Sequence, residues 1–584
     1  MESEPARGVR WGLVLRAVVP VLLLALIGSV VVLVPDWMWT LPLDQRRRVI
    51  ETFLRGVLVV YFLGLVAGSV GTPLLGWLAF RSWRRGQFRP WLGKTALACW
   101  GTLVALIGAE AGAAFWNAWV HRTPTLPTRF PEPTPAGQVR LAVLGESSAA
   151  GELYQPWLSV GKILAWQLQE AIPGTTYVAE VLAEPGVTLE RMHQKLEGLR
   201  QRPDAVIVYC GHNEFQARFD WARRVGVSEV PSSRLLRALY EVSQRSPLCR
   251  LIYEQTTRAR LDAPPMATPH DLIDSPICTP TETRGILEDF HNRLEAIVSY
   301  VEQIGAIPIL VVPPGNEAGF EPNRSSLPGD TPAAESEGVR QMFKQASALE
   351  VTEPDRSLAL YRDLARSHPG LAEAHFRLGR LLQRFGSDAE ARGCYERARD
   401  MDGFPQRCTT SLQKAYRQVA SRHGCILIDG PAELRALNPH GLLDDTLFHD
   451  AQHPALRGHM ALAEALLREL ARTERLGWPE GRAAPRLDPA ACAAHFGIGQ
   501  AQWAKVCERA AWFAGATASN RFDPTERLAK QRRYEEAARE LNQGTEPEAT
   551  GIPGLGTHPA PEVDPSWALQ PREAAPAVRT AGDR

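Results

Sequence analysis

The stretch VRLAVLGESS, residues 139–148, decides the class of the fold. Its apolar first part is typical of a buried β-strand, and the glycine and serines that follow come just before a helical pattern. Four more short apolar runs occur along the chain, each separated from the next by an amphipathic helical pattern. The five predicted strands are residues 139–145, 177–182, 204–210, 307–312 and 425–429. This alternation predicts an α/β domain whose parallel sheet is covered by helices on both faces.

Two long inserts interrupt the alternation. Residues 216–282 form a connection without clear periodicity, the kind of excursion that often shapes a binding cleft. Within residues 340–404, a spacing of 34 residues relates Tyr361 to Tyr395 and matches the period of a tetratricopeptide (TPR) repeat. We count about one and a half repeats, and fewer than about three seldom stand alone. We therefore expect this TPR-like α-helical insert to pack on the α/β domain, whose two parts are residues 138–339 and 405–480.

The first 120 residues are far more apolar than the rest of the chain. Three runs with few or no charges, at about residues 12–34, 56–80 and 95–119, are each long enough for a helix to cross a bilayer. Arginines and lysines near their ends favour a cytoplasmic N-terminus and place everything after residue 120 outside. The sequence thus predicts a multi-pass region of three transmembrane helices, residues 1–122, in the cytoplasmic (inner) membrane, with an extracytoplasmic, periplasmic α/β domain.

A carboxylate lies inside the third apolar run. Glu110 is costly in lipid and should face other helices. Gly108 and Gly112, one turn apart, are expected to permit close helix contact around it. We interpret Glu110 as a packing or snorkelling residue rather than a proton relay, because no second intramembrane charge is available to it.

Three further segments complete the chain. Residues 123–137 contain five prolines and predict a semi-rigid spacer in the polyproline II conformation. Residues 488–542 predict a C-terminal helical region, in which Cys492 and Cys507 could pair if the domain is extracytoplasmic. Residues 543–584 are rich in proline and poor in large apolar residues, which predicts a disordered tail.

Charge and cysteine content exclude several classes of protein. The 65 Lys and Arg residues balance 65 Asp and Glu residues, so the chain lacks the basic excess that binds nucleic-acid phosphates. Nine scattered cysteines without a C-x-x-C pair disfavour a disulfide scaffold and a zinc ribbon. We therefore expect no nucleic-acid partner, no metal and no cofactor.

Ser147 and the turn near residue 450 carry the residue types of nucleophilic catalysis. Ser147 follows the first strand, and open α/β sheets bind ligands at the carboxyl ends of their strands. A serine hydroxyl is a weak nucleophile and requires a base. Asp450 and His453, separated by two residues in a turn, allow the carboxylate to orient an imidazole that deprotonates the serine. This division of labour is that of a Ser-His-Asp triad.

Two other strand ends are placed to donate hydrogen bonds to an oxyanion. Gly186 follows the second strand and Asn213 follows the third. Together with the backbone N–H of Ser147 they could form an oxyanion hole, since all three loops end parallel strands at one edge of the sheet. His212 and Glu214 are interpreted as supports for the loop that carries Asn213.

The same residues have plainer interpretations. An isolated Ser147 or Asp450 would be read as a helix N-cap. A cap does not explain a histidine three residues after Asp450. His449, His453 and His459 could bind a metal, but no carboxylate or cysteine accompanies them at ligand spacing. The triad is therefore the favoured interpretation.

Four blocks of sequence, in this order, resemble the successive blocks of the SGNH (GDSL-like) hydrolase superfamily. They are GESS at 145–148, PGVT at 185–188, GHNE at 211–214 and DAQHP at 450–454. The resemblance covers roughly residues 139–315 and 420–475. It implies a flavodoxin-like three-layer α/β/α domain that hydrolyses esters or thioesters through an acyl-enzyme.

The resemblance also implies a role for each matching residue. Ser147 would be the nucleophile, His453 the general base and Asp450 its orienting acid, while Gly186 and Asn213 would complete the oxyanion hole with the Ser147 amide. The chain departs from the family pattern in two places. The usual aspartate before the nucleophile is replaced by glutamate at position 146, and the asparagine that often precedes the oxyanion glycine is absent.

The resemblance and the apolar N-terminal region together imply a membrane-anchored SGNH/GDSL-like serine esterase acting on acylated envelope glycans or lipids. One alternative uses the same acyl-enzyme but passes the acyl group to a sugar hydroxyl, as an O-acyltransferase of an envelope polysaccharide. Another is a catalytically inert membrane scaffold. The expected partners are an acyl ester substrate, the membrane and, through residues 340–404, a protein.

Overall fold

The computed structural model describes most of the chain in two compact units. The described residues are 61–216, 245–251, 271–559 and 563–570, apart from positions 62, 88, 121–125, 250, 275, 279 and 565. We call residues 1–123 with 220–266 the membrane unit, and residues 124–219 with 267–584 the sheet unit. The first predicted apolar run, residues 12–34, lies outside the described residues.

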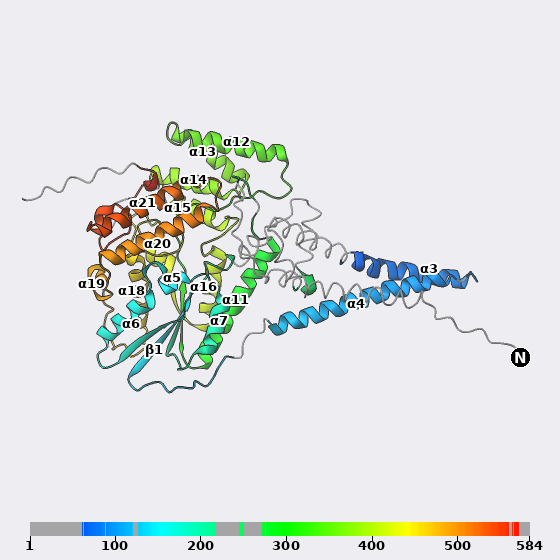
Figure 1. Ribbon diagram of the computed structural model, residues 1–584, viewed down its shortest axis with the longest axis horizontal. Coiled ribbons are helices and arrows are strands. Elements are labelled where there is room, and N and C mark those ends of the chain that lie inside the picture. The colour runs from blue at the N-terminus through cyan, green and yellow to red at the C-terminus, as the bar shows by residue number, and fades with distance from the viewer. Residues whose placement is uncertain are drawn as a thin grey trace, which may run out of the picture. The chain divides into compact units, whose positions relative to one another are not determined.

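Five parallel strands form one sheet in the order β2-β1-β3-β4-β5 (Figure 1). The strands are β1 (Gln138–Gly145), β2 (Thr176–Val181), β3 (Ala205–Tyr209), β4 (Ile307–Val312) and β5 (Ile426–Asp429). Each boundary lies within one residue of the prediction, so all five predicted strands are confirmed. This strand order is that of flavodoxin-like doubly wound sheets.

Helices cover both faces of the sheet (Figure 1). Alternate strand residues enter two separate cores: Val143 belongs to one and its neighbour Leu144 to the other. The first core is completed by α6 (Val160–Ala171) and α18 (Leu456–Arg472). The second is completed by α7 (Leu189–Lys195), α11 (Pro280–Gln303) and α16 (Thr410–His423). Short helices in the connections are α5 (Ser147–Ala150), η2 (Glu152–Tyr154), η3 (Leu196–Gly198) and α17 (Gly430–Arg435).

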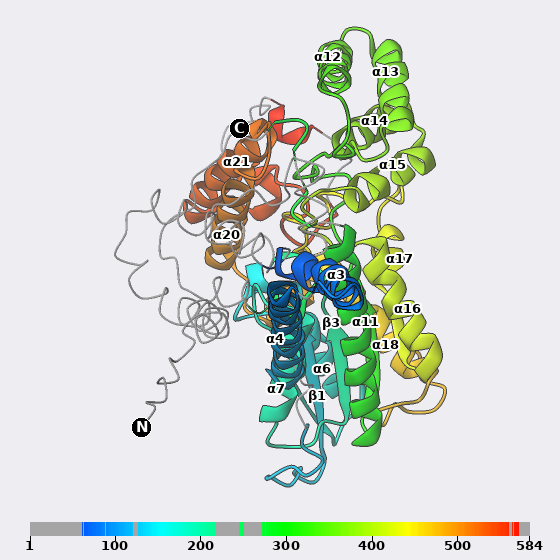
Figure 2. The same ribbon diagram turned by 90° about the vertical axis from the view of Figure 1, so that its right-hand side faces the viewer.

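The helical insert consists of four consecutive helices, each packed against the next (Figure 2). They are α12 (Ala333–Leu349), α13 (Pro354–Ser367), α14 (Ala372–Arg384) and α15 (Asp388–Asp400). The insert has two pairs of helices, its first helix begins before residue 340, and its identity as a TPR-like repeat stays a prediction. Arg380 of α14 forms a buried ion pair with Glu526, 2.6 Å between Nη1 and Oε1, so the insert packs on the C-terminal helix α21 (Thr525–Asn542).

The C-terminal region forms α19 (Pro489–His495), α20 (Gln500–Ala518) and α21 (Thr525–Asn542). The long pair α20 and α21 pack on each other and join the core that contains α6 and α18. Cys492 and Cys507 are buried in this core and both are free thiols, so the suggested pairing is not formed. The helical region is thus continuous with the α/β core rather than a separate layer.

The C-terminal tail is structured further than expected. Two short helices, η4 (Pro547–Thr550) and η5 (Trp567–Leu569), follow α21. Ile552, Leu555 and Trp567 are buried, and the Trp567 indole donates a hydrogen bond to Asp445. The predicted disorder is wrong for these residues, because a few well-separated apolar side chains are enough to hold the chain on the core.

The proline-rich segment is also not a free spacer over its described part, residues 126–137. Leu126 and Phe130 pack against the core on the α7 and α11 face. Tyr300 donates to the carbonyl of Pro127 at 2.7 Å, and the N–H of Glu132 donates to Arg200 at 2.9 Å. Proline composition predicted the extended shape but not these side-chain anchors.

The membrane unit contains two stretches, among the described residues, that are long and apolar enough to cross a membrane. The first, Leu63–Arg84, includes a π-helical turn η1 (Ala67–Gly71) and α3 (Thr72–Arg84), and the second, Pro90–Trp116, lies in α4 (Pro90–Val120). They coincide with the predicted runs 56–80 and 95–119. Their large apolar side chains are mostly exposed.

Close helix packing in this unit uses glycines that the sequence analysis did not single out for it. A Cβ on Gly64 would lie 2.9 Å from Leu106, and one on Gly68 would lie 2.7 Å from Leu103. Gly108 and Gly112, which were expected to provide the close contact, would have no described atom within 4 Å of an added Cβ.

Glu110 faces neutral hydrogen-bond donors rather than a charge. Its carboxylate accepts from the Tyr61 hydroxyl at 2.5 Å, from the Ser246 hydroxyl and from the Leu248 N–H at 3.1 Å. Ser246 and Leu248 belong to the long connection after β3. The expectation that Glu110 faces protein is thus met by a segment far away in the sequence.

Candidate active site

The first strand delivers Ser147 to the carboxyl edge of the sheet. β1 ends at Gly145, and a Cβ there would lie 2.1 Å from the carbonyl oxygen of Tyr209 on β3, so only glycine allows the two strands to stay paired up to this turn. Glu146 is the extended residue before α5, and Ser147 is the first residue of that helix. Ser147 therefore does not occupy the N-cap position, and it is only 3% exposed.

Asp450 and His453 form the hydrogen-bonded pair that the sequence predicted. Asp450 Oδ2 and His453 Nδ1 are 2.6 Å apart, and Asp450 Oδ1 accepts the backbone N–H groups of Gln452 and His453, both at 2.9 Å. Burial opposes ionisation of the carboxyl, but His453 and these N–H donors hold the pKa of Asp450 below its ordinary value. The carboxylate is thus fixed in position and orients the imidazole.

Ser147 lies against the same turn through Gln452. Its hydroxyl oxygen accepts a hydrogen bond from the Gln452 side chain at 3.4 Å, and the next hydroxyl, of Ser148, donates to the Gln452 carbonyl at 2.9 Å. His453 Nε2 is buried and has no hydrogen-bond partner among the described residues. The structure therefore brings Ser147 and the histidine pair to one turn without a Ser147–His453 hydrogen bond. With Nδ1 donating to Asp450, Nε2 is left to accept a proton.

Glu146 connects the turn that carries Ser147 to the loop after β3. Its carboxylate accepts the backbone N–H groups of Gly211 at 2.8 Å, of His212, and of Asn213 at 2.9 Å. Burial raises the pKa of Glu146 to about 8, although these three donors lower it. The sequence marked this residue only as a departure from the family pattern, because its partners lie some 65 residues away.

Gly186 and Asn213, the expected oxyanion donors, approach one another through Val187. The Asn213 amide donates one hydrogen to the Val187 carbonyl at 3.2 Å, which leaves its second hydrogen free of that bond. Gly186 has φ +73°, a conformation that favours glycine. The N–H of Glu184 donates to the carbonyl of Gly145 at 3.2 Å, so this loop lies beside the end of β1.

The neighbours of Asn213 support its loop. The N–H of Cys408 donates to His212 Nδ1 at 3.1 Å, and Glu214 accepts the N–H of Leu189 at 2.9 Å. Burial raises the pKa of Glu214 to about 7 and lowers that of His212 to about 3. Both side chains therefore have a structural partner on another element.

Helices late in the chain complete the surroundings of the histidine. Phe513 of α20 packs on the His453 ring with centroids 4.7 Å apart. Tyr534 of α21 donates to the carbonyl of His449 at 3.2 Å. No motif points to these aromatic residues, because the contact depends on how α20 and α21 pack on the sheet unit.

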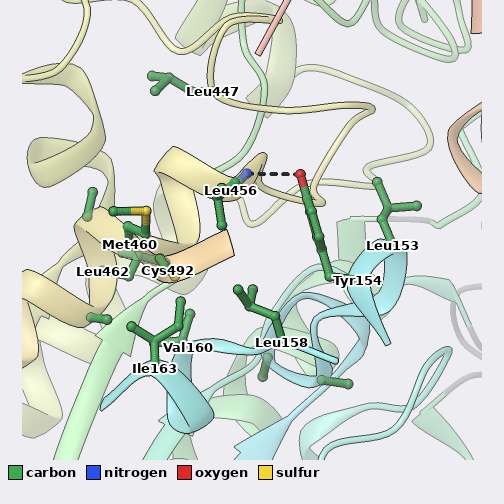
Figure 3. Packing of buried hydrophobic residues seen from close by; sticks show 14 of the residues in the cluster. Leu153, Tyr154, Leu158, Val160, Ile163, Leu447, Leu456, Met460, Leu462 and Cys492 are labelled. Atoms are coloured by element: carbon green, nitrogen blue, oxygen red, sulfur yellow. Dashed lines mark hydrogen bonds between the residues drawn. The ribbon is translucent and has the colours of Figure 1, made fainter. Parts of the chain in front are cut away.

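Tyr154 of η2 also contacts the segment around the Asp450–His453 turn. Its hydroxyl accepts the N–H of Leu456 at 3.0 Å, the bond drawn in Figure 3, and lies 2.9 Å from His449 Nε2. Burial lowers the pKa of His449 to about 4 and that of His459 to about 3. These histidines are neutral core residues, and the described part of the chain has no group of three or more His, Cys, Asp or Glu that could hold a metal.

Asn316, in the buried loop after β4, also holds the catalytic turn. Its amide donates to Asp445 at 2.8 Å and to the carbonyl of Asp450 at 3.1 Å. An asparagine in an irregular loop gives no sequence signal of this role.

Known proteins offer only a distant likeness. No model of a protein family matches the chain, and no curated protein does. Solved structures similar to it include Axe2, an acetylxylan esterase from Geobacillus stearothermophilus, at 13% identity over 59% of this chain and 97% of that one, with a TM-score of 0.27. Another is LAE5, an α/β hydrolase enzyme from the metagenome of Lake Arreo, Spain, at 15% identity over 57% of this chain and 94% of that one, with a TM-score of 0.26. Likeness at this level carries no argument about activity, so the functional argument rests on the site itself.

Proposed function

We propose that this chain is a membrane-anchored serine ester hydrolase of the SGNH type. The observation that carries the proposal is the buried Asp450–His453 pair, whose Nε2 has no hydrogen-bond partner among the described residues and lies on the same turn that contacts Ser147. The carboxylate bonded to Nδ1 distinguishes His453 from the buried His212, whose Nδ1 accepts a backbone N–H.

The proposed reaction begins when His453 Nε2 removes the proton of the Ser147 hydroxyl as the oxygen attacks the ester carbonyl. The backbone N–H groups of Ser147 and Gly186 and the amide of Asn213 stabilise the oxyanion. Asp450 stabilises the imidazolium, which gives its proton to the departing alcohol. Water then attacks the acyl-enzyme by the same route, releasing the acid. Before the first step, the hydrogen bond between the Gln452 side chain and the Ser147 hydroxyl must be replaced by one from that hydroxyl to His453 Nε2.

The burial of the site favours one second candidate. Ser147 is 3% exposed and His453 2% exposed, so bulk water has little access to an acyl group on Ser147. A sugar hydroxyl held in place of water would then receive the acyl group, which is the reaction of an O-acyltransferase. Analysis of the products formed with and without a sugar acceptor distinguishes transfer from hydrolysis.

The anchoring is proposed from the two described apolar helices and from the predicted run at residues 12–34. Together they form a three-span, multi-pass anchor in the cytoplasmic membrane, with the sheet unit on the periplasmic side. Envelope glycans or lipids carrying ester-linked acyl groups are the substrates within reach of such a site.

The nucleophile is tested on the full chain in detergent micelles with a fluorophosphonate probe and a short-chain ester. Wild-type protein should be labelled, while Ser147→Ala should lose labelling and roughly 10⁴–10⁶ in kcat, as should His453→Ala in kcat. Ser148→Ala is the matched control, since its hydroxyl donates to a carbonyl, and it should still be labelled. Labelling that persists in Ser147→Ala would refute the proposed nucleophile.

A further inference from the structure

Two aromatic residues of helix α20, Phe513 and Trp512, extend from the proposed catalytic histidine to the solvent. Phe513 packs on the His453 ring, tilted by 51°, and Trp512 meets the Phe513 ring edge-on with centroids 4.9 Å apart. His453 is 2% exposed, whereas Trp512 is 65% exposed. Two adjacent aromatic residues of α20 thus form an apolar surface that begins at the proposed base and ends in water.

This surface is fixed to the segment that follows the nucleophile helix. Arg509, one turn before Trp512 on α20, donates to the carbonyls of Glu152, Leu153 and Gln155 at 3.3, 3.0 and 2.6 Å. Its guanidinium also lies over the Trp157 ring, 5.5 Å from the centroid. Because one guanidinium bonds to three carbonyls, α20 is fixed relative to η2. The aromatic pair on α20 therefore has a fixed position before any substrate binds.

Glu152, whose carbonyl accepts from Arg509 of α20, also carries an unsatisfied side-chain acceptor. Glu152 Oε2 is buried and has no hydrogen-bond partner among the described residues. Burial raises the pKa of Glu152, an effect that the charges of His453 and Arg509 oppose and that of Asp450 reinforces, so this carboxyl lies within the field of the proposed triad. A buried acceptor without a donor is unfavourable until a ligand or water supplies one.

From this arrangement we infer that Trp512, Phe513 and Glu152 form the subsite for the alcohol part of the ester, and that this alcohol is a polyhydroxylated ring, a sugar. The inference rests on the proposed esterase function. A sugar ring offers C–H groups to the face of an indole and hydroxyl donors to a carboxylate. An alkyl chain would satisfy the aromatic surface but leave Glu152 without a donor.

The substitution Trp512→Ala tests the aromatic part in the full-length protein. The kcat/KM values for an acetylated cello-oligosaccharide and for ethyl acetate, which has no ring, are compared. We expect the ratio of the first to the second to fall roughly 3- to 10-fold, the size of a lost aromatic contact. Phe385→Ala is the matched control, because Phe385 is 45% exposed but lies at the end of α14, and its ratio should equal that of wild type.

The substitution Glu152→Gln tests the acceptor. A carboxamide keeps the size but accepts weaker hydrogen bonds, so the same ratio should fall about 10-fold or more, the usual size of a charge-assisted hydrogen bond. An unchanged ratio in both variants overturns the subsite. A rise in KM for ethyl octanoate relative to ethyl acetate in Trp512→Ala also overturns it, by assigning the surface to an acyl chain. Failure of the esterase proposal looks different: wild-type protein would then hydrolyse none of the three esters.

Discussion

At the scale of single residues, Glu146 joins the two loops on which the proposed reaction depends. It directly precedes Ser147 in the chain and accepts backbone N–H groups from the loop that carries Asn213. Its two oxygens satisfy all three donors, Oε1 accepting from Gly211 and His212 and Oε2 from Asn213. The position of Asn213 relative to the nucleophile is therefore set by this side chain.

The substitution Glu146→Gln should impair turnover without weakening binding. One amide oxygen can replace Oε1, but the NH₂ group would then face the N–H of Asn213, donor against donor. We expect kcat to fall about 10- to 100-fold with KM nearly unchanged, and Asn213→Ala to cost about 10²- to 10³-fold. If Glu146 acts by placing Asn213, the double variant should lose little more than Asn213→Ala alone. Losses that multiply would show that the two residues act independently.

The same residue should give the protein a pH-dependent stability. The pKa of Glu146 is raised from 4.5 to about 8 by burial, so its contribution to stability is fully present below pH 4.5 and is lost as the pH rises towards 8. Glu146→Gln cannot titrate. The melting temperature of wild type relative to this variant should therefore fall between pH 4.5 and 8, measured by circular dichroism. A constant difference over that range would show that Glu146 has an ordinary pKa in the fold.

The residues of the site fall into two groups: those whose contacts lie within one turn of the sequence, and those whose contacts join distant elements. Asp450 and His453 lie in one turn, so their spacing alone predicted the hydrogen bond that the structure contains. Glu146, Phe513 and Asn316 act through contacts between distant elements, and no spacing along the chain encodes such contacts. The catalytic roles of all five residues named from the sequence stay predictions: Ser147, Asp450, His453, Gly186 and Asn213.

At the scale of elements, the strands were predictable because each is a short apolar run between helices whose periodicity is clear. The C-terminal tail has no such run, and its structure was not predicted. Ile552, Leu555 and Trp567 are buried individually, separated by polar and proline residues, so composition over a window pointed to disorder. Burial of single side chains against an existing core has no periodic signature.

The attachment of the insert depends on a buried ion pair between α14 and α21. The side chains of Arg380 and Glu526 are 10% and 8% exposed, so loss of one charge leaves the other buried and uncompensated. We expect Glu526→Gln to lower the free energy of unfolding by about 3–5 kcal/mol. The control Glu390→Gln removes an exposed pair with Arg362, and it should cost less than about 1 kcal/mol. Urea unfolding of the two variants provides the comparison, and equal effects would contradict the assigned role of the buried pair.

At the scale of the whole molecule, the chain passes between its two units three times. Residues 220–266 leave the sheet unit soon after Asn213 and belong to the membrane unit, where Ser246 and Leu248 bond to Glu110. The membrane unit is thus assembled from two separate stretches of sequence. Hydropathy identifies the apolar residues of the first stretch but gives no signal for residues 220–266. The hydrogen-bond donors of Glu110 in that second stretch were therefore not predicted.

The number of spans decides the side of the membrane on which the sheet unit lies. With a cytoplasmic N-terminus, three spans place it outside, whereas the two described helices alone would return it to the cytoplasm. Alkaline phosphatase needs its disulfides and is active only in an oxidising compartment. Fused to the C-terminus of the full chain, it should therefore be active, and fused within the arginine-rich loop between α3 and α4 it should be inactive. An inactive C-terminal fusion, made in good yield, would show that residues 12–34 do not cross the membrane and would put the proposed esterase on the cytoplasmic side.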